Sequence, residues 1–303
     1  MPSSADAVVP GMSVSENTTM TQKSPNPERI RRITESIIGL PTLPTVVSKM
    51  IELVDNPKTS AGSLARLIST DQSLTARILK LANSAYYGFS REISTVNMAI
   101  VVMGFNAVKD MGLSLSVFDI FKNSTNFRHF DITKFWEHSV GCGVASKMIA
   151  HRYHHSIAGE AFVAGLLHDI GKVILNQYAH AEFVEIMNRV TMGEESFDDA
   201  ELNVTGTHHG EVGGWLADKW RLPSAISESI RRHHNPTEAR HEPLLVALVT
   251  IGDYLCHINA IGNSGRPVPI PPDAGTWRLL HEYNVPLDED ELENLSAEFL
   301  LEL

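Results

Sequence analysis

The chain has 303 residues, of which 43% are apolar and 20% are charged. These proportions exclude a wholly disordered chain. The chain has no run of about 18 or more apolar residues, so we expect no membrane span. The formal net charge of −11 argues against a broad nucleic-acid-binding surface, although the acidic end of the chain from Asp288 onward carries much of that charge.

The cysteine content and the first residues indicate the compartment. Only Cys142 and Cys256 are present, and two cysteines cannot build a disulfide framework. Both lie among apolar residues, so we expect buried thiols in a reducing cytoplasm. The start of the chain has no basic region followed by an apolar stretch, so we expect no secretory signal and no membrane partner.

Apolar residues recur at helical spacing along most of the chain, and no stretch shows the sustained alternation of a sheet. The sequence therefore predicts an all-α fold. We divide it into a disordered tail, an N-terminal helical subdomain, a second helical subdomain, and a Pro/Gly linker followed by an acidic amphipathic helix, over residues 1–27, 28–124, 125–262 and 263–303.

The expected helices of the N-terminal subdomain are a first one from Pro27 to before Leu40, and then 46–54, 60–68, 73–82, 94–103 and 108–121. Thr45 and Asp71 are the expected N-caps of the helices that follow them. In the rest of the chain we expect helices over 133–153, 159–176, 179–192, 196–202, 209–220, 224–233, 243–261 and 288–303.

Histidine is the unusual residue, with fourteen in the chain. The pair His168-Asp169 interrupts an apolar helical pattern, and an ionised carboxylate is costly to bury without a partner. A metal ion is one such partner, because imidazole and carboxylate both donate lone pairs to it. Taken alone, however, a His-Asp pair is more often a hydrogen-bonded or surface pair.

The order of the histidines and acids along the chain strengthens the metal interpretation. Separate predicted helices carry, in turn, His138, His168-Asp169, His209, His233-His234 and Asp253. Seven nitrogen and oxygen donors exceed the needs of one tetrahedral ion and suit two adjacent ions of iron, manganese or zinc. Two such ions could clamp a phosphate and activate a water.

Two of these donors, and the nearby Lys172, each have an alternative interpretation. His209 is preferred to His208 because Gly213 lies four residues further on. Asp253 by itself would be a buried acid with hydroxyl or amide partners. Lys172 lies one turn beyond His168 and could contact a phosphate oxygen, but an ordinary solvated lysine is equally compatible with the sequence.

Several short motifs are spread over more than two thirds of the chain. They are Leu40-Pro41-Thr42-Leu43-Pro44, Asp71-Gln72-Ser73-Leu74, Ile78-Leu79-Lys80-Leu81-Ala82-Asn83-Ser84-Ala85, Ala99-Ile100 with Gly104, His168-Asp169-Ile170-Gly171-Lys172, His209 with Glu211-Val212-Gly213, Trp220-Arg221-Leu222-Pro223 and His233-His234-Asn235-Pro236. Together they resemble the HDOD family, within the HD superfamily of metal-dependent phosphohydrolases.

The resemblance implies an all-α fold of two packed helical subdomains, the second an HD-type bundle, and a role in bacterial signal transduction. It also implies a relationship to the HD-GYP phosphodiesterases, and all seven donors match the metal positions of that branch. Two features depart from it: Asn235-Pro236-Thr237 replaces the Gly-Tyr-Pro motif, and Lys134 stands where an acid for a third metal would lie. We therefore expect two metals rather than three.

Three functions are compatible with this ligand set. The first is a signalling module that retains the two-metal centre and acts through contacts with other signalling proteins, with a nucleotide or phosphate as a candidate ligand. The second is a metal-dependent phosphodiesterase or phosphohydrolase in which Asp169 and Lys172 are catalytic. The third is a di-iron oxygenase. The helical region before Ser124 favours the first, because an enzyme has no obvious need of it.

Overall fold

The computed structural model describes residues 28, 31, 42, 44–53, 60–83, 93–121, 130–153 and 155–303. Within these ranges the chain forms helices and loops without any strand, so the all-α prediction is confirmed. The expected tail over residues 1–27 and nearly all of the first expected helix lie outside the described residues.

The N-terminal helices are α2 (Thr45–Glu52), α3 (Ala61–Ser69), α4 (Gln72–Ala82), α5 (Val96–Met103) and α6 (Phe105–Phe121). Asp71 caps α4 as predicted, because its carboxylate accepts a hydrogen bond from the Leu74 amide at 3.0 Å. The predicted cap at Thr45 is wrong. The Pro44 carbonyl accepts the first helical hydrogen bonds of α2, so Pro44 is the N-cap and Thr45 is already helical.

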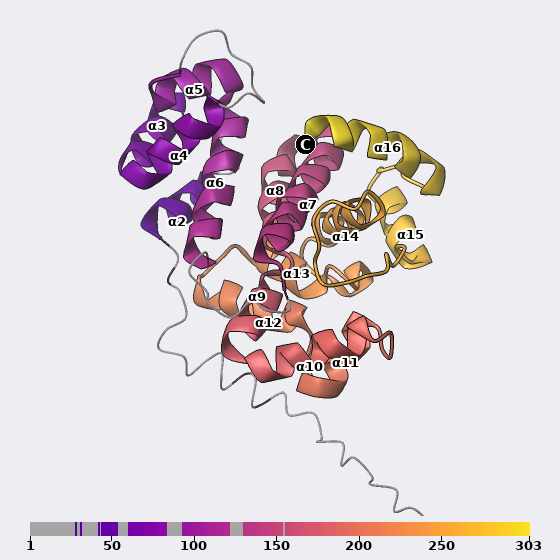
Figure 1. Ribbon diagram of the computed structural model, residues 1–303. Helices are drawn as coiled ribbons and strands as arrows, with labels where there is room; N and C mark the ends of the chain where they lie inside the picture. Colours follow the sequence, from indigo (N-terminus) through magenta and orange to yellow (C-terminus); the bar gives the residue numbers. More distant parts are fainter. Residues whose placement is uncertain are drawn as a thin grey trace, which may run out of the picture.

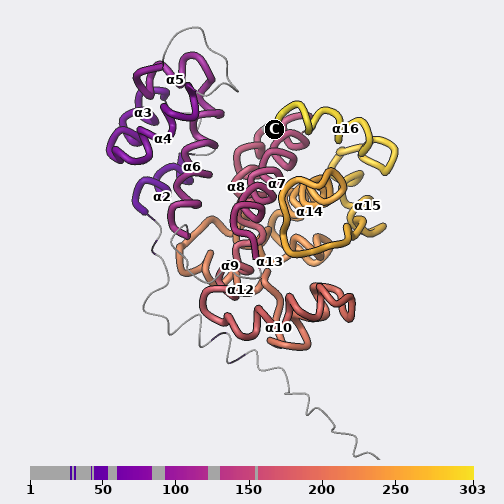
Figure 2. Tube along the Cα trace, viewed as in Figure 1, coloured from indigo at the N-terminus to yellow at the C-terminus, as the bar shows by residue number. Residues whose placement is uncertain are grey.

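The remaining helices are α7 (Ile132–Tyr153), η1 (His155–Ile157), α8 (Ala158–Leu167), α9 (Ile170–Tyr178), α10 (His180–Thr191), α11 (Phe197–Thr205), α12 (His209–Lys219), α13 (Ser224–Arg232), η2 (Pro236–Glu238), α14 (Pro243–Ile258), α15 (Ala274–Glu282) and α16 (Glu289–Glu302). In Figure 1, α7 and α8 run through the middle of the molecule, with α2–α6 on one side and α14–α16 on the other. The helices α9–α12 lie across one end (Figure 2).

One predicted helix, over residues 159–176, is in fact two. The helix α8 ends at Leu167, and α9 begins at Ile170 after a turn at His168 and Asp169. Asp169 adopts φ −96° and ψ 7°, which takes the backbone out of the helical path. Apolar periodicity continues through the turn, so it could not reveal this break. The turn lets two consecutive side chains face the same buried space.

The end of the chain packs on α7 and α14. Asp273 caps α15, a helix that the sequence did not predict, by accepting hydrogen bonds from the Thr276 amide and hydroxyl at 2.7 Å. On α16, Leu292, Leu295 and Phe299 are buried, as the predicted amphipathic helix requires. Leu303 follows the end of the helix and is exposed.

Both cysteines are free and fully buried, as predicted, in the apolar core that α7 and α8 form with α14.

Across the described part of the chain, no helix has the combination of length and apolar character that crossing a membrane requires.

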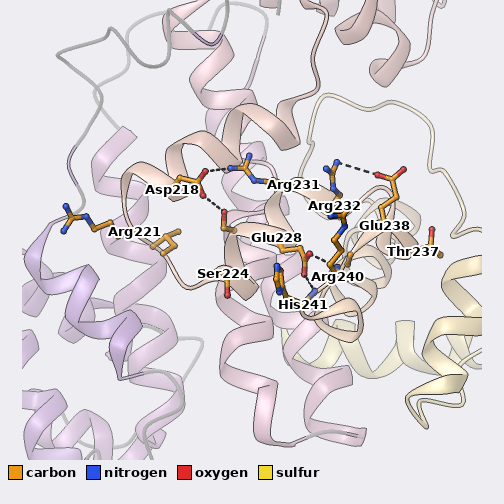
Figure 3. A pocket seen from close by; sticks show the side chains of 13 residues that line it. Asp218, Arg221, Ser224, Glu228, Arg231, Arg232, Thr237, Glu238, Arg240 and His241 are labelled. Carbon is orange, nitrogen blue, oxygen red and sulfur yellow. Dashed lines mark hydrogen bonds and ion pairs between the residues drawn. The ribbon is translucent and has the colours of Figure 1, made fainter. Parts of the chain in front are cut away.

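Glu228 on α13 lines a surface groove and holds the segment between α13 and α14 in place through hydrogen bonds (Figure 3). Its carboxylate accepts hydrogen bonds from the amides of Arg240, His241 and Glu242 at 2.7–2.9 Å. Burial would raise the pKa of the Glu228 carboxyl, but the three amides lower it below its usual value. The charged form of Glu228 therefore stabilises the folded state.

We predict that Glu228→Gln lowers the free energy of unfolding by about 1 kcal/mol at pH 7, a figure that allows for solvent screening of a partly exposed group. Because the folded-state pKa is depressed, this stabilisation is present above the unfolded-state pKa and is lost as pH falls through the folded-state pKa. Urea unfolding of both proteins at several pH values measures the difference. A gap that stays constant down to pH 3 would contradict the assignment.

Candidate metal centre

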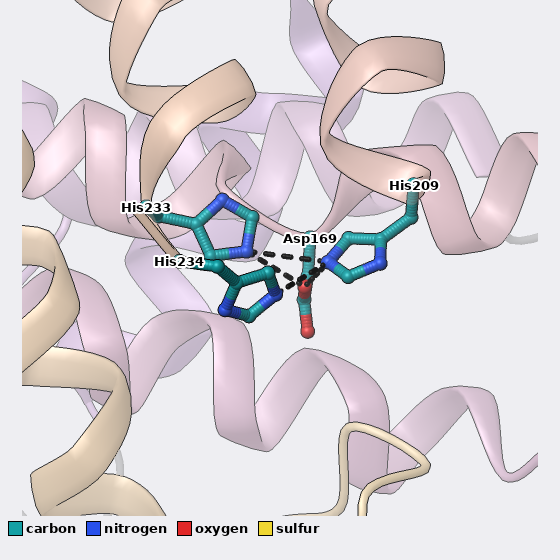
Figure 4. A group of neighbouring side chains, drawn as sticks. All are labelled: Asp169, His209, His233 and His234. Carbon is teal, nitrogen blue, oxygen red and sulfur yellow. Dashed lines mark hydrogen bonds and ion pairs between the residues drawn. The ribbon is translucent and has the colours of Figure 1, made fainter. Parts of the chain in front are cut away.

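The structure brings all seven predicted donors close together, and all of them except the half-buried His234 are buried. They come from α7, from the turn between α8 and α9, from the start of α12, from the end of α13, and from α14. They form two neighbouring groups, one of His138, His168 and Asp253 and the other of Asp169, His209, His233 and His234. In each group the candidate ligand atoms lie within 4.8 Å of one another, and Figure 4 shows the second group.

The distances in both groups fit ligands of a common ion. In the first group, Nε2 of His138 lies 2.9 Å from Oδ1 of Asp253, and Nε2 of His168 lies 3.5 Å from the same oxygen. In the second group, Nε2 of His209 lies 3.0 Å from Oδ1 of Asp169. Two atoms that are each about 2.1 Å from one ion lie roughly 3.0–3.4 Å apart at right-angled to tetrahedral geometry.

Asp169 joins the two groups because its two oxygens face different partners. Its Oδ1 lies 3.0 Å from His209 Nε2 and 3.6 Å from His233 Nε2, whereas its Oδ2 lies 3.4 Å from His168 Nε2. Lys172 donates a hydrogen bond to Oδ2 at 2.7 Å and is itself buried. Lys172 is therefore not a solvated lysine, and Asp169 is placed as a bridging carboxylate would be.

Hydrogen bonds fix the orientation of the imidazole rings of His168, His209 and His233. The Nδ1–H groups of His168 and His233 donate to the carbonyls of Gly165 and Ile230, at 2.7 and 2.9 Å. The Nδ1–H of His209 donates to Oε2 of Glu201 at 2.7 Å. In the neutral rings each Nε2 then carries a lone pair, which is the form that binds metal.

These nitrogens lie so close together that each pair needs a proton or a metal cation between them. Nε2 of His209 lies 3.2 Å from that of His233 and 3.1 Å from that of His234. His168 Nε2 and Asp169 Oδ1 are buried and have no hydrogen-bond partner of their own. Unsatisfied buried acceptors are costly, and a cation shared by several of them removes that cost. The donor set therefore fits metal ions.

The pKa shifts of Asp169 and His233 agree with this requirement. Burial would raise the pKa of the Asp169 carboxyl, but Lys172 and the rings of His168 and His209 hold it well below its usual range. Burial lowers the pKa of His233 to about 4, so this ring is neutral at pH 7. An ionised carboxylate beside a neutral imidazole is the combination that binds a divalent transition metal.

Burial would lower the pKa of His168 and His209, but Cys142 and Asp169 raise the pKa of His168 well above its usual value, and Glu201 raises that of His209. Protonation of these two rings therefore competes with metal binding.

Glu201 on α11 was not predicted as part of the site. It is fully buried, and Oε2 accepts hydrogen bonds from both Nδ1 and the backbone amide of His209. A carboxylate behind an imidazole fixes the ring and makes it a stronger ligand. Glu201 precedes His209 by eight residues across a helix end, and nothing in the sequence separates it from the neighbouring acids Asp198 and Asp199.

We predict that Glu201→Gln lowers metal affinity by about 10–100-fold, because a neutral amide supports the His209 ring less strongly than a carboxylate. Competition with a coloured chelator measures the affinity of the wild type and the variant. Glu194→Gln, a change of the same kind at an exposed acid, is the matched control and should bind metal as the wild type does. Equal affinity in all three proteins would contradict the role of Glu201.

Arg266 is a second residue that sequence reasoning missed, since it lies in the stretch interpreted as a linker. Its side chain is buried, and Nη2 contacts Oδ1 of Asp198 at 2.7 Å and Nε2 of His234 at 3.1 Å. Its Nε is buried without a hydrogen-bond partner. With Lys172, it places a second fixed cation beside the second group, and this positive charge would favour an anion there.

His208 and Lys134 do not belong to either group of donors. The His208 side chain is 45% exposed, and Lys134 pairs with Glu137 on the surface at 2.6 Å. His257, one turn after Asp253, borders the first group, because its Nε2 lies 3.4 Å from Asp253 Oδ1. Asp253 is not simply a buried acid with hydroxyl or amide partners, because imidazoles of His138, His168 and His257 surround it.

Comparison with solved structures places this fold among known ones. A crystal structure of an HDOD domain protein with unknown function from Geobacter sulfurreducens is 26% identical, with a TM-score of 0.76 over 91% of this chain and 98% of that chain. A protein from Marinobacter aquaeolei VT8, named as a candidate signal transduction protein, is 20% identical, with a TM-score of 0.73 over 90% of this chain and 62% of that chain.

Sequence comparison identifies the family. An uncharacterized protein of Treponema pallidum (strain Nichols) is 24% identical over 213 residues, which cover 69% of this chain but only 40% of that relative's length. The HDOD domain model matches residues 40–236. Because this match spans well over half of the sequence and the fold agrees, the chain belongs to the HDOD family.

Proposed function

We propose that the chain is a regulatory HDOD module of bacterial signal transduction that holds two divalent transition-metal ions. The observation that carries the proposal is the pair of buried His/Asp groups that share Asp169. The signal-transduction role rests on membership of the HDOD family and on the name of the Marinobacter aquaeolei relative. Other signalling proteins are the partners that this role implies.

Each ion would have four protein donors. His138, His168, Asp253 and Oδ2 of Asp169 would hold the first ion, and Oδ1 of Asp169 with His209, His233 and His234 would hold the second. Imidazole mixed with carboxylate favours iron or manganese, and zinc is the alternative. Bound there, two ions would supply Lewis acidity toward a phosphate oxygen and activate a water.

Elemental analysis of the protein purified without added metal tests the proposal. We expect about two transition-metal ions per chain, and recovery of both when a chelator-treated sample is reconstituted with iron or manganese. Fewer than about half an ion per chain, with no gain on reconstitution, would contradict the proposal.

A second candidate function is a metal-dependent phosphodiesterase or phosphohydrolase. The observation that favours it is the pair of buried cations, Lys172 and Arg266, which contact Asp169 and His234 of the second group, since fixed cations would bind phosphate oxygens. In this case Lys172 and Arg266 would orient the phosphoester, and Asp169 would hold both ions. A nucleotide or another phosphoester would be the substrate.

Phosphoester turnover separates the two functions. We expect the metal-loaded protein to release no product from cyclic dinucleotides, cyclic mononucleotides or bis(p-nitrophenyl) phosphate if it acts only through protein contacts. Turnover that is lost both in Asp169→Asn and after chelation would assign the enzymatic function instead.

A further inference from the structure

A second cavity lies beside α7. Its lining on that helix begins at Val140, two residues after the metal-ligand candidate His138, and the cavity wall includes none of the seven donors. The helix α6 runs beside α7 and α8 (Figures 1 and 2), and a cavity of about 900 Å³ lies between these helices, with Leu81 of α4 and residues 301–303 also in its lining. The lining is mainly apolar and includes Met111, Leu115, Val144, Met148 and Phe162. This volume and lining, between packed helices, are typical of small-molecule sites.

One polar group in the cavity wall lacks a partner. Asp110 on α6 lines the cavity and is only 7% exposed. One of its carboxylate oxygens, Oδ2, forms an ion pair with Lys147 of α7, whereas Oδ1 is buried and accepts no hydrogen bond. A buried acceptor of this kind is costly. Because Asp110 lines the cavity, a rotation of its carboxylate would present this oxygen to a ligand donor.

The charges in the wall define the class of ligand. Lys147 already neutralises Asp110, and the other titratable side chains of the lining, His151 and Glu302, are exposed, so the buried part of the lining has no net charge to attract an ion. Apolar side chains from α6, α7 and α8 surround this pair. An uncharged molecule with one N–H or O–H group therefore matches both the apolar wall and the free acceptor.

We propose that this cavity binds an uncharged, mostly apolar small molecule that donates one hydrogen bond to Asp110. The site is independent of the metal centre and stands whether or not ions bind there. It goes beyond the proposed function because it gives the regulatory module a site at which a small molecule would act as the input signal. An occupant would contact α7, which lines the cavity with Val144 and carries His138 at the metal centre.

A fluorescent probe of this class tests the proposal. N-phenyl-1-naphthylamine is uncharged and aromatic, carries one N–H group, and becomes bright in apolar surroundings. We expect saturable binding to the full chain with one probe per protein. Ser114→Trp on α6 and Val144→Trp on α7 add a ring to the cavity from two different helices, and each should weaken binding at least about tenfold. Two variants are used so that misfolding of one does not remove the test.

Val101→Trp is the matched control. Val101 is apolar, 82% exposed on α5 and outside the cavity lining, so the added ring should leave probe binding unchanged. Equal binding by the wild type and by a folded cavity-filling variant would overturn the proposal, because the probe would then lie on another surface. Thermal unfolding identifies which variants are folded.

The hydrogen bond to Asp110 has its own test. The N-methyl derivative of the probe keeps the aromatic rings but has no donor, and it should bind the wild type roughly tenfold more weakly. Equal affinity for the two probes would overturn the role of Asp110 in ligand recognition.

Discussion

Asp169→Asn is expected to lose both metal ions, although it changes a single carboxylate. Oδ1 of Asp169 faces the second group and Oδ2 faces the first, so the substitution removes a ligand from each ion. The loss of an outer partner costs about 10–100-fold in affinity, and the loss of a shared ligand should cost at least the upper figure. Elemental analysis should show a fall from about two ions to fewer than about half an ion per chain.

The asparagine variant is chosen because its carbonyl oxygen can still accept the hydrogen bond from Lys172. Asp169→Ala would in addition leave a buried ammonium without a partner, at a cost of about 3–5 kcal/mol. Asp290→Asn, the same change at an exposed position on α16, should keep both ions. A folded Asp169→Asn protein that retains two ions would show that Asp169 does not bridge them.

Gly171→Ala is expected to destabilise the protein and to weaken metal binding together. A Cβ at this position would lie 1.9 Å from the backbone oxygen of His209 and 2.8 Å from the amide nitrogen of Gly213. Backbone atoms of a packed helix cannot rotate aside, so α12 would have to move away from α9 and take His209 with it. We expect a loss of at least about 2–3 kcal/mol of stability, or a Tm lower by roughly 5 °C or more.

Gly62→Ala provides the matched control for this substitution. At Gly62 the nearest atom to an added Cβ is 3.6 Å away, which is ordinary contact, and the residue lies in α3. Alanine should be neutral or stabilising there, by up to about 1 kcal/mol. Thermal unfolding and metal content are measured on both variants. A Gly171→Ala protein as stable as Gly62→Ala would contradict the close contact between α9 and α12.

Most of the fold could be predicted because helices bury periodic apolar faces. Outside the 159–176 segment, the predicted helices that the structure describes agree with their observed bounds to within three residues. The errors arise where local geometry overrides periodicity. The turn at Asp169 leaves the apolar pattern intact, and α15 lies after a segment rich in proline and glycine that indicated a loop.

The donors of the site could be predicted because their residue types and order along separate helices are distinctive. The residues that contact and orient these donors, Glu201 and Arg266, could not be predicted. Glu201 resembles the other acids of its helix in sequence, and its role appears only when the chain folds back to place it against His209. Arg266 reaches His234 from a loop, so its contact depends on tertiary packing that no local pattern records.

The most direct test of the account is anomalous X-ray diffraction from crystals of the iron- or manganese-loaded protein. We predict two anomalous peaks about 3.5–4 Å apart, one among His138, His168 and Asp253 and the other among His209, His233 and His234, with Asp169 between them. The account would be contradicted by the absence of any peak at these side chains, or by a single peak with Asp169 turned away from it.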